Sequence, residues 1–114
     1  MEGCIFCKIA RHEIPSKIVY EDDDVVAFHD VNPVAPVHVL IIPKEHISGV
    51  LDIPSGRADL AGRILATAAR IATELSVAEK GFRVVVNQGQ YAGQSVQHLH
   101  FHLLGGRRMS WPPG

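Results

Sequence analysis

Three histidines alternate with apolar residues near the C-terminal end of the chain. His98, His100 and His102 are three of the seven histidines, and Leu99 and Phe101 separate them. Successive side chains of a β-strand point to opposite faces, so this pattern places the imidazoles on one face and the apolar residues on the other. At about 3.3 Å per residue, the outer two rings stand roughly 13 Å apart. One small ligand can touch two of them, and we expect the three to have different roles.

Two kinds of chemistry compete for that face. A His-x-His pair on a strand can chelate zinc, and the metal is catalytic where a third ligand and an open position exist. Alternatively, one imidazole is a nucleophile and the others assist it, because an unperturbed pKa of about 6.5 leaves a free lone pair at physiological pH. The spacing alone leaves both open.

The composition describes a small domain without a dominant charge. The 114 residues are 46% hydrophobic, and 11 Lys and Arg against 12 Asp and Glu give a net charge of -1. This balance supplies no field for a polynucleotide or an anionic membrane, so we expect neither partner. No apolar run has the length of a membrane span, and no secretion signal is visible. We expect a single domain over residues 1–114, located in the cytoplasm.

Residue patterns predict two helices and five strands. A short helix is expected over residues 4–10, and a long amphipathic helix over residues 57–75 with Ser55 as its N-cap. The predicted strands cover residues 17–21, 25–30, 37–43, 83–87 and 97–104. A glycine-rich loop over residues 88–95 leads into the histidine strand, and its backbone N–H groups could approach an anion.

Several segments in a fixed order match a known family. The histidine segment has the form His-x-His-x-His-x-x. The other segments are residues 4–9, 27–30, 36–38, 42–47, 93–96 and 111–114. Together they resemble the histidine triad (HIT) superfamily, and within it the HINT branch of purine nucleoside phosphoramidases. The resemblance implies an α+β fold, with a five-stranded antiparallel sheet and one long and one short helix, and a homodimer with a continuous ten-stranded sheet.

The resemblance also implies a site for a purine nucleoside monophosphate or phosphoramidate. His100 is expected to be the nucleophile, which forms a covalent nucleotidyl-histidine intermediate. The groups around the phosphate and the leaving group are expected to be His38, Asn87, Gly93, Gln94, Ser95 and His102. The expected base pocket consists of Ile5, Phe6, Ile9, Phe28, Val31 and Leu40. Asp30 is expected to hold the ribose hydroxyls, and Trp111 to approach the site of the partner subunit.

Elementary chemistry agrees with a histidine nucleophile. A phosphoramidate is anionic, so a neutral imidazole can attack its phosphorus without adding charge repulsion and divides the reaction into two displacements. Donors beside the phosphate stabilise its oxygens and supply a proton to the leaving nitrogen. His100 also needs its second ring nitrogen protonated and held, most simply by a backbone carbonyl. Water then releases the nucleoside monophosphate. Catalysis by this route needs no metal or other cofactor.

The two cysteines suggest a separate metal site. Cys4 and Cys7 have the spacing of metal ligands, although two small buried apolar side chains would also explain them. His46 and His98 can complete a tetrahedral set with no open position, which is the arrangement of a structural zinc. We expect such a zinc to support stability rather than chemistry. It would also leave His98 without a catalytic role.

Two other functions fit parts of the sequence. A zinc-dependent metallohydrolase would use His98 and His100 as catalytic ligands. A nucleotide-binding interaction or regulatory module would hydrolyse its ligand only incidentally. The leading hypothesis is an adenosine 5'-monophosphoramidase-like hydrolase that cleaves the P–N bond of purine nucleoside 5'-phosphoramidates, with aminoacyl adenylates as further substrates. An apolar base pocket does not distinguish adenine from guanine strongly.

Overall fold

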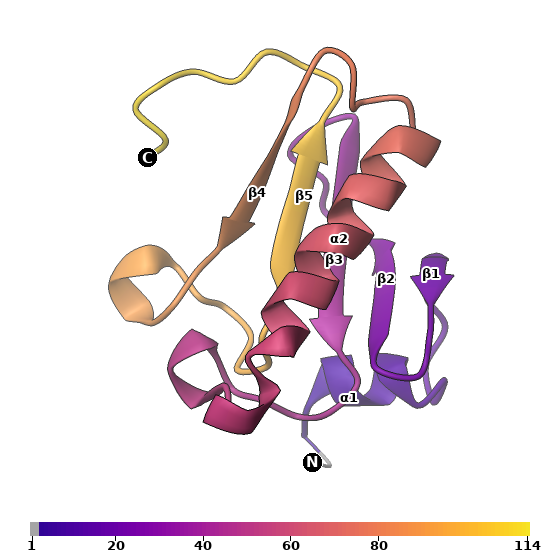
Figure 1. Cartoon of the computed structure of the whole chain (residues 1–114), viewed down its shortest axis with the longest axis vertical. Coiled ribbons are helices and arrows are strands. Elements are labelled where there is room, and N and C mark those ends of the chain that lie inside the picture. The colour runs from indigo at the N-terminus through magenta and orange to yellow at the C-terminus, as the bar shows by residue number, and fades with distance from the viewer. Residues whose placement is uncertain (1–2) are drawn as a thin grey trace.

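Alternating apolar side chains build a five-stranded antiparallel sheet, as the sequence predicts. The computed structural model describes residues 3–114. The strands are β1 (Ile18–Glu21), β2 (Val25–His29), β3 (Val37–Pro43), β4 (Phe82–Val86) and β5 (Phe101–Gly105). Their order in the sheet is β1-β2-β3-β5-β4, so β3 and β5 are central and β4 forms one edge (Figure 1). The expected α+β architecture is confirmed.

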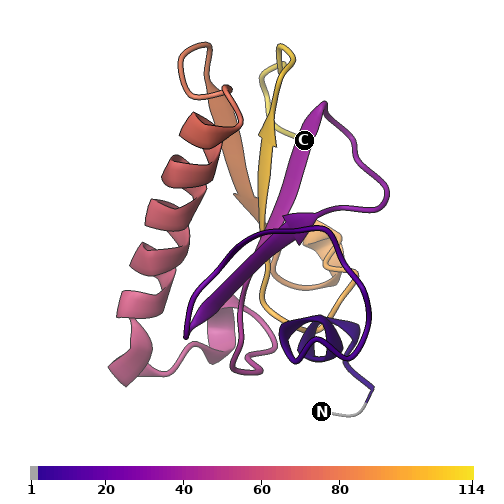
Figure 2. The same cartoon turned by 90° about the vertical axis from the view of Figure 1, so that its right-hand side faces the viewer.

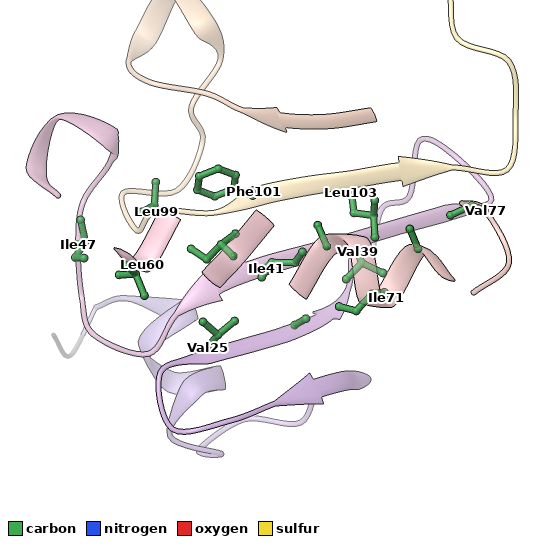
Figure 3. Packing of buried hydrophobic residues seen from close by; sticks show 14 residues of the cluster. Val25, Val39, Ile41, Ile47, Leu60, Ile71, Val77, Leu99, Phe101 and Leu103 are labelled. Carbon is green, nitrogen blue, oxygen red and sulfur yellow. The ribbon is translucent and has the colours of Figure 1, made fainter. Parts of the chain in front are cut away.

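The two helices cover opposite faces of this sheet (Figure 2). Val39 and Ile41 of β3 belong to a large core together with the long helix α2 (Asp59–Glu74), shown in Figure 3. Leu40 and Ile42 of the same strand pack with the short helix α1 (Ile5–Ala10) in a second cluster. Because β3 is buried on both faces, its sequence is a nearly continuous apolar run.

The long helix is amphipathic as predicted, but the predicted N-cap is wrong. Ser55 lies in a 3-10 turn, Ser55–Arg57, and Ala58 stands at the N-cap without a side-chain hydrogen bond. The turn forms because the N–H of Arg57 donates to the carbonyl of Pro54 at 2.8 Å, which delays the start of the helix. Among residues 3–114, neither helix combines the length and the apolar character that crossing a bilayer requires.

The histidine strand is shorter than the predicted residues 97–104. β5 begins only at Phe101, opposite Ile41 of β3. Continuing the ladder would bring the chain to Pro43, which has no N–H to donate. The Pro43 carbonyl instead accepts a hydrogen bond from the side chain of His98 at 2.8 Å. His98 and His100 therefore precede the regular strand, although their side chains keep the alternation of faces.

Candidate active site

A cleft of about 1090 Å³ opens on the α1 side of the sheet and reaches the histidine segment. This volume is slightly above the range of about 300–1,000 Å³ for small-molecule sites. The predicted site residues that line it are Ile5, Phe6, Ile9, Phe28, Asp30, Val31, His38, Leu40, Ser95, His100 and His102. Apolar side chains thus meet imidazole, hydroxyl and carboxylate groups in one cleft. This combination suits a ligand with an aromatic part and an anionic part.

His100 is buried and its ring is fixed by a backbone group. Its Nδ1 lies 2.7 Å from the carbonyl oxygen of His98, which can only accept a hydrogen bond. The proton of the neutral ring must therefore be on Nδ1, and Nε2 keeps a free lone pair. The ring of Phe6 packs edge-on against this imidazole, with centroids 5.2 Å apart. His100 has the tautomer and the support that an imidazole nucleophile requires.

A second fixed tautomer lies in the histidine–aspartate cluster, which consists of Asp30, His38 and His102. The N–H of Val34 donates to Nδ1 of His38 at 3.1 Å, so the proton of His38 must be on Nε2. That Nε2 lies 2.9 Å from Nδ1 of His102 and 3.3 Å from Oδ2 of Asp30. His102 accepts at Nδ1 and carries its own proton on Nε2. The N–H of Val34 thus determines, through His38, that His102 has a hydrogen-bond donor at Nε2.

Burial keeps this pair of rings neutral. Burial, assisted by the nearby His100 and His38, lowers the pKa of His102 to about 4. Burial also lowers the pKa of His38, against the opposing effect of the Asp30 carboxylate. Both imidazoles are therefore uncharged at neutral pH. The Nε2–H of His102 is therefore a neutral hydrogen-bond donor, not the acidic proton of an imidazolium.

The cysteine–histidine cluster, formed by Cys4, Cys7, His46 and His98, has the geometry of a tetrahedral metal site. Its four ligand atoms lie within 4.8 Å of one another. Sγ of Cys4 is 3.3 Å from Nδ1 of His98, and Sγ of Cys7 is 3.3 Å from Nδ1 of His46 and 3.5 Å from Nδ1 of His98. Ligands about 2.0–2.3 Å from zinc are about 3.3–3.8 Å apart in a tetrahedron.

Hydrogen bonding also prepares this cluster for a metal. Nε2–H of His98 donates to the Pro43 carbonyl, so the lone pair of the ring is on Nδ1, which faces the sulfurs. An outer hydrogen bond of this kind is typical of metal-binding histidines. The same contacts remove His98 from the predicted metallohydrolase pair with His100, because both of its ring nitrogens are directed elsewhere.

The histidine–aspartate cluster is spaced for a metal but is not prepared for one. Its three ligand atoms also lie within 4.8 Å of one another. However, ligation by Nε2 of His38 requires loss of the Nε2 proton, and Nδ1 cannot take this proton because it accepts the Val34 N–H. Binding would have to create an imidazolate or break that hydrogen bond. Spacing alone would not have distinguished the two clusters.

Four predicted binding residues do not line this cleft, within the part of the chain that the structure describes. The Asn87 amide donates to the carbonyl of Ala92 at 2.8 Å, and Gln94 holds the glycine-rich loop through the N–H of Gly89 and the carbonyl of Ser48. Gly93 has a positive φ of 78° at the end of a turn. Trp111 is 80% exposed, with the Arg83 guanidinium 5.8 Å from its ring centre. Their binding roles stay predictions.

Several groups that shape the site were not predicted from the sequence. The Val34 N–H and the Pro43 carbonyl orient imidazoles, and backbone groups carry no residue-type signal. Lys17, His29 and Val96 line the cleft although we assigned them no role. Lys17, an exposed cation that precedes an apolar strand, could have been sought as a contact for an anionic ligand.

Comparison with known proteins agrees with this architecture. Residues 11–109 match the HIT domain family. The 14 kDa zinc-binding protein of Brassica juncea is 49% identical over 112 residues, which cover 96% of this chain and 98% of that protein. Adenylylsulfatase HINT1 of Arabidopsis thaliana is 49% identical over 112 residues, which cover 96% of this chain and 76% of that protein.

A solved structure is equally similar. A HIT family hydrolase from Legionella pneumophila Philadelphia 1 is 47% identical and superposes with a TM-score of 0.95, covering 98% of this chain and 100% of that chain. The fold is the α+β architecture of that HIT family hydrolase. The chain belongs to the histidine triad (HIT) family, in its HINT branch. The predicted family is confirmed.

Proposed function

We propose that this protein cleaves the P–N bond of purine nucleoside 5'-phosphoramidates through a covalent nucleotide adduct on His100. The observation that carries this proposal is the 2.7 Å hydrogen bond from His100 Nδ1 to the carbonyl of His98. In the neutral ring it leaves Nε2 with a free lone pair, on a residue that lines the cleft. Such a nitrogen can attack an anionic phosphorus without electrostatic repulsion.

The reaction consists of two displacements at phosphorus. In the first, Nε2 of His100 bonds to phosphorus, the P–N bond breaks, and the leaving nitrogen keeps the electron pair and takes one proton from water in the open cleft. In the second, water attacks phosphorus, the bond to Nε2 breaks, and one proton returns to the solvent. The products are an amine and a nucleoside 5'-monophosphate. Each step exchanges one bond to phosphorus for another.

The histidine–aspartate cluster supports both steps electrostatically. His102 directs an Nε2–H into the site because its Nδ1 is occupied by His38 at 2.9 Å. A neutral donor of this kind stabilises the phosphate oxygens as negative charge develops on them. The hydroxyl of Ser95, which also lines the cleft, can donate a hydrogen bond to the leaving nitrogen.

The remainder of the cleft suits a nucleoside. Asp30 uses Oδ1 to accept the N–H of Asn32 at 2.8 Å, and its carboxylate has further lone pairs for ribose hydroxyls. Phe28 and Leu40 are buried in the wall beside α1, and Ile5 is 51% exposed there. An apolar wall of this type binds a purine ring by contact and reads its edges only weakly.

The decisive variant is His100→Ala. We expect turnover of adenosine 5'-phosphoramidate to fall by at least about a thousandfold, because the nucleophile is removed, while binding of adenosine 5'-monophosphate persists. Steady-state kinetics and isothermal titration calorimetry measure the two effects. His12→Ala, at an exposed histidine outside the cleft, is the matched control. Turnover of the His100→Ala variant within about tenfold of the parent would refute the nucleophile assignment.

The substrate range can include other activated adenylates. The plant relative named adenylylsulfatase HINT1 is 49% identical to this chain, which favours a shared adenylyl group. Attack by His100 on the phosphorus of adenylyl sulfate or of an aminoacyl adenylate would form the same adduct. Comparing kcat/KM for these substrates with the value for the phosphoramidate tests this second candidate.

Zinc is the metal that suits the cysteine–histidine cluster. Two thiolates and two imidazoles match its preferred ligands and leave no open position. Similarity to the 14 kDa zinc-binding protein of Brassica juncea supports this assignment. Bound zinc would link α1 to the chain around His46 and His98. The proposed chemistry at phosphorus uses none of these four residues as a reacting group.

We further infer a homodimer formed through β4. This strand is the edge of the sheet next to β5, and its Phe82 and Val86 are each 38% exposed. An edge strand with exposed apolar residues can pair with the same strand of a second copy, which would give the ten-stranded sheet implied by the family resemblance. Light scattering of the wild type and of a Val86→Lys variant tests this interface.

A further inference from the structure

We propose that the cysteine–histidine cluster positions the nucleophile, so that metal bound there sets the orientation and the tautomer of His100. The inference rests on the proposed function only in treating His100 as the nucleophile. The positioning residues are His98 and Phe6, and each connects the cluster to the His100 ring by a separate contact.

The first connection runs through the backbone of His98. The carbonyl of this residue is the acceptor that holds the proton of His100 on Nδ1, at 2.7 Å. β5 starts at Phe101, so the His98 carbonyl lies outside the regular strand pairing. The N–H of Leu99, in the same peptide, donates to the carbonyl of Ile47 at 2.6 Å, next to His46 of the cluster. The side chain of His98 is held at both ring nitrogens, by the Pro43 carbonyl at Nε2 and by the sulfurs at Nδ1. Fixing this ring fixes the peptide that orients His100.

The second connection runs through α1. Phe6 lies between the two cysteines in sequence, and its ring packs edge-on against both His98 and His100, with centroids 6.0 and 5.2 Å apart. The helix has only six residues, too few to be stable alone. Its start is held by Sγ of Cys4, which accepts the N–H of Cys7 at 3.3 Å. Fixing the cysteines therefore holds Phe6 against the nucleophile.

Through these contacts, zinc would orient His100 in addition to its expected role in stability. Both the acceptor for Nδ1–H and the ring packed against His100 depend on residues that the metal would tie together. Loss of the metal is expected to leave the sheet intact but to free α1 and the rings of His46 and His98, so that the His98 peptide is held less firmly, by the hydrogen bond from Leu99 to Ile47. His100 would then exchange between tautomers, and the fraction with a free Nε2 would fall. A misplaced reacting group commonly costs about a hundredfold in rate.

The test compares His46→Gln with His12→Gln. His46 contacts Cys7 at 3.3 Å and stacks edge-on against His98 at 5.0 Å, but it does not line the cleft. We expect His46→Gln to lose zinc, to keep its sheet by circular dichroism, and to lower kcat by at least about tenfold. Nitrogen-15 spectra of the imidazoles should show the His100 signals moving from a pure Nδ1–H tautomer to averaged values. His12→Gln should change none of these.

A second pair of variants covers the possibility that His46→Gln does not fold. Cys4→His supplies another zinc ligand, whereas Cys4→Ser does not. We expect Cys4→His to retain both the bound zinc and the Nδ1–H tautomer of His100, and Cys4→Ser to lose both. Folded, zinc-free protein with an unchanged His100 tautomer would overturn the proposal. This spectrum is independent of turnover, so failure of the phosphoramidase assignment would show separately, as activity that survives His100→Ala.

Discussion

His98 and His102 stand two residues to either side of His100, and both carry their proton on Nε2, yet they belong to clusters with opposite uses. In the cysteine–histidine cluster, the lone pair of His98 faces sulfur atoms, whose protons a metal displaces readily. In the histidine–aspartate cluster, the lone pair of His102 already accepts a proton from His38, and the Val34 N–H prevents that proton from moving. Both clusters are compact.

The comparison shows that proton positions, rather than distances, decide what a group of histidines can do. A compact set of nitrogen and sulfur atoms suits zinc only if its lone pairs converge. Where one ring donates a hydrogen bond to the next, the second ring keeps its own N–H free to donate to a phosphate oxygen. His100 lies between the two and differs from both, because its proton is on Nδ1. The predictions below test this division of roles.

Removing one cysteine should have the largest effect. Cys7→Ser takes away a zinc ligand and is expected to reduce the zinc content from about one per chain to near zero. Unfolding free energy should fall by at least about 3 kcal/mol, because metal binding contributes directly to folding. Elemental analysis and urea unfolding measure these quantities. His38→Gln, in the histidine–aspartate cluster, should leave the zinc content unchanged. Loss of zinc in this variant would contradict the assignment of zinc to the cysteine–histidine cluster alone.

Removing the donor of the other cluster should affect rate rather than metal. His102→Asn can keep an oxygen acceptor for the Nε2–H of His38 but has no donor at the Nε2 position. We expect kcat to fall about a hundredfold, equivalent to roughly 2.7 kcal/mol, because one oxyanion donor is lost. Zinc content should stay at the parental value. A decrease in kcat of less than about threefold would show that His102 does not stabilise the reacting phosphate.

Acid should weaken the fold through the neutral histidines. His102 has a pKa of about 4 in the folded chain and an ordinary value of 6.5 when unfolded, so between these values the unfolded state binds more protons. Its contribution to stability is complete above pH 6.5 and is lost as the pH falls toward 4. Unfolding in urea at pH 5 and 7 should show a smaller difference for His102→Asn than for the wild type. An equal change in unfolding free energy between pH 5 and 7 in both proteins would contradict the lowered pKa of His102.

The smallest expected effect comes from freeing the tautomer of His38. Val34→Pro deletes the N–H that donates to His38 Nδ1, so the ring can move its proton there and expose Nε2 as a ligand. In protein with cobalt in place of zinc at the cysteine–histidine cluster, we expect weak binding of a second cobalt ion at the histidine–aspartate cluster. New absorption bands should show it in Val34→Pro but not in Val34→Ala. Binding of a second ion by the wild type would show that the Val34 hydrogen bond does not exclude metal.

Side-chain patterns predicted the helices and strands, and the family resemblance supplied the residues of the cleft, but backbone groups set the chemistry. Strict alternation around Phe101 placed histidines and core residues on opposite sides, and the apolar run of β3 marked the buried central strand. The start of β5 was missed because Pro43 ends the ladder and uses its carbonyl for His98. The chemistry of an imidazole nucleophile predicted a backbone carbonyl at the second ring nitrogen of His100, and the His98 carbonyl lies there at 2.7 Å. The tautomers of His38 and His102 were not predicted, because the N–H of Val34 determines them and almost any residue type supplies such a group.

Trapping the intermediate tests the central assignment most directly. The wild-type protein would be mixed with labelled adenosine 5'-phosphoramidate, quenched within one turnover, digested, and analysed by mass spectrometry under conditions that preserve P–N bonds. We predict one adenylyl group, attached to His100. Label on a different residue, or steady turnover with no labelled peptide at any time point, would contradict the account.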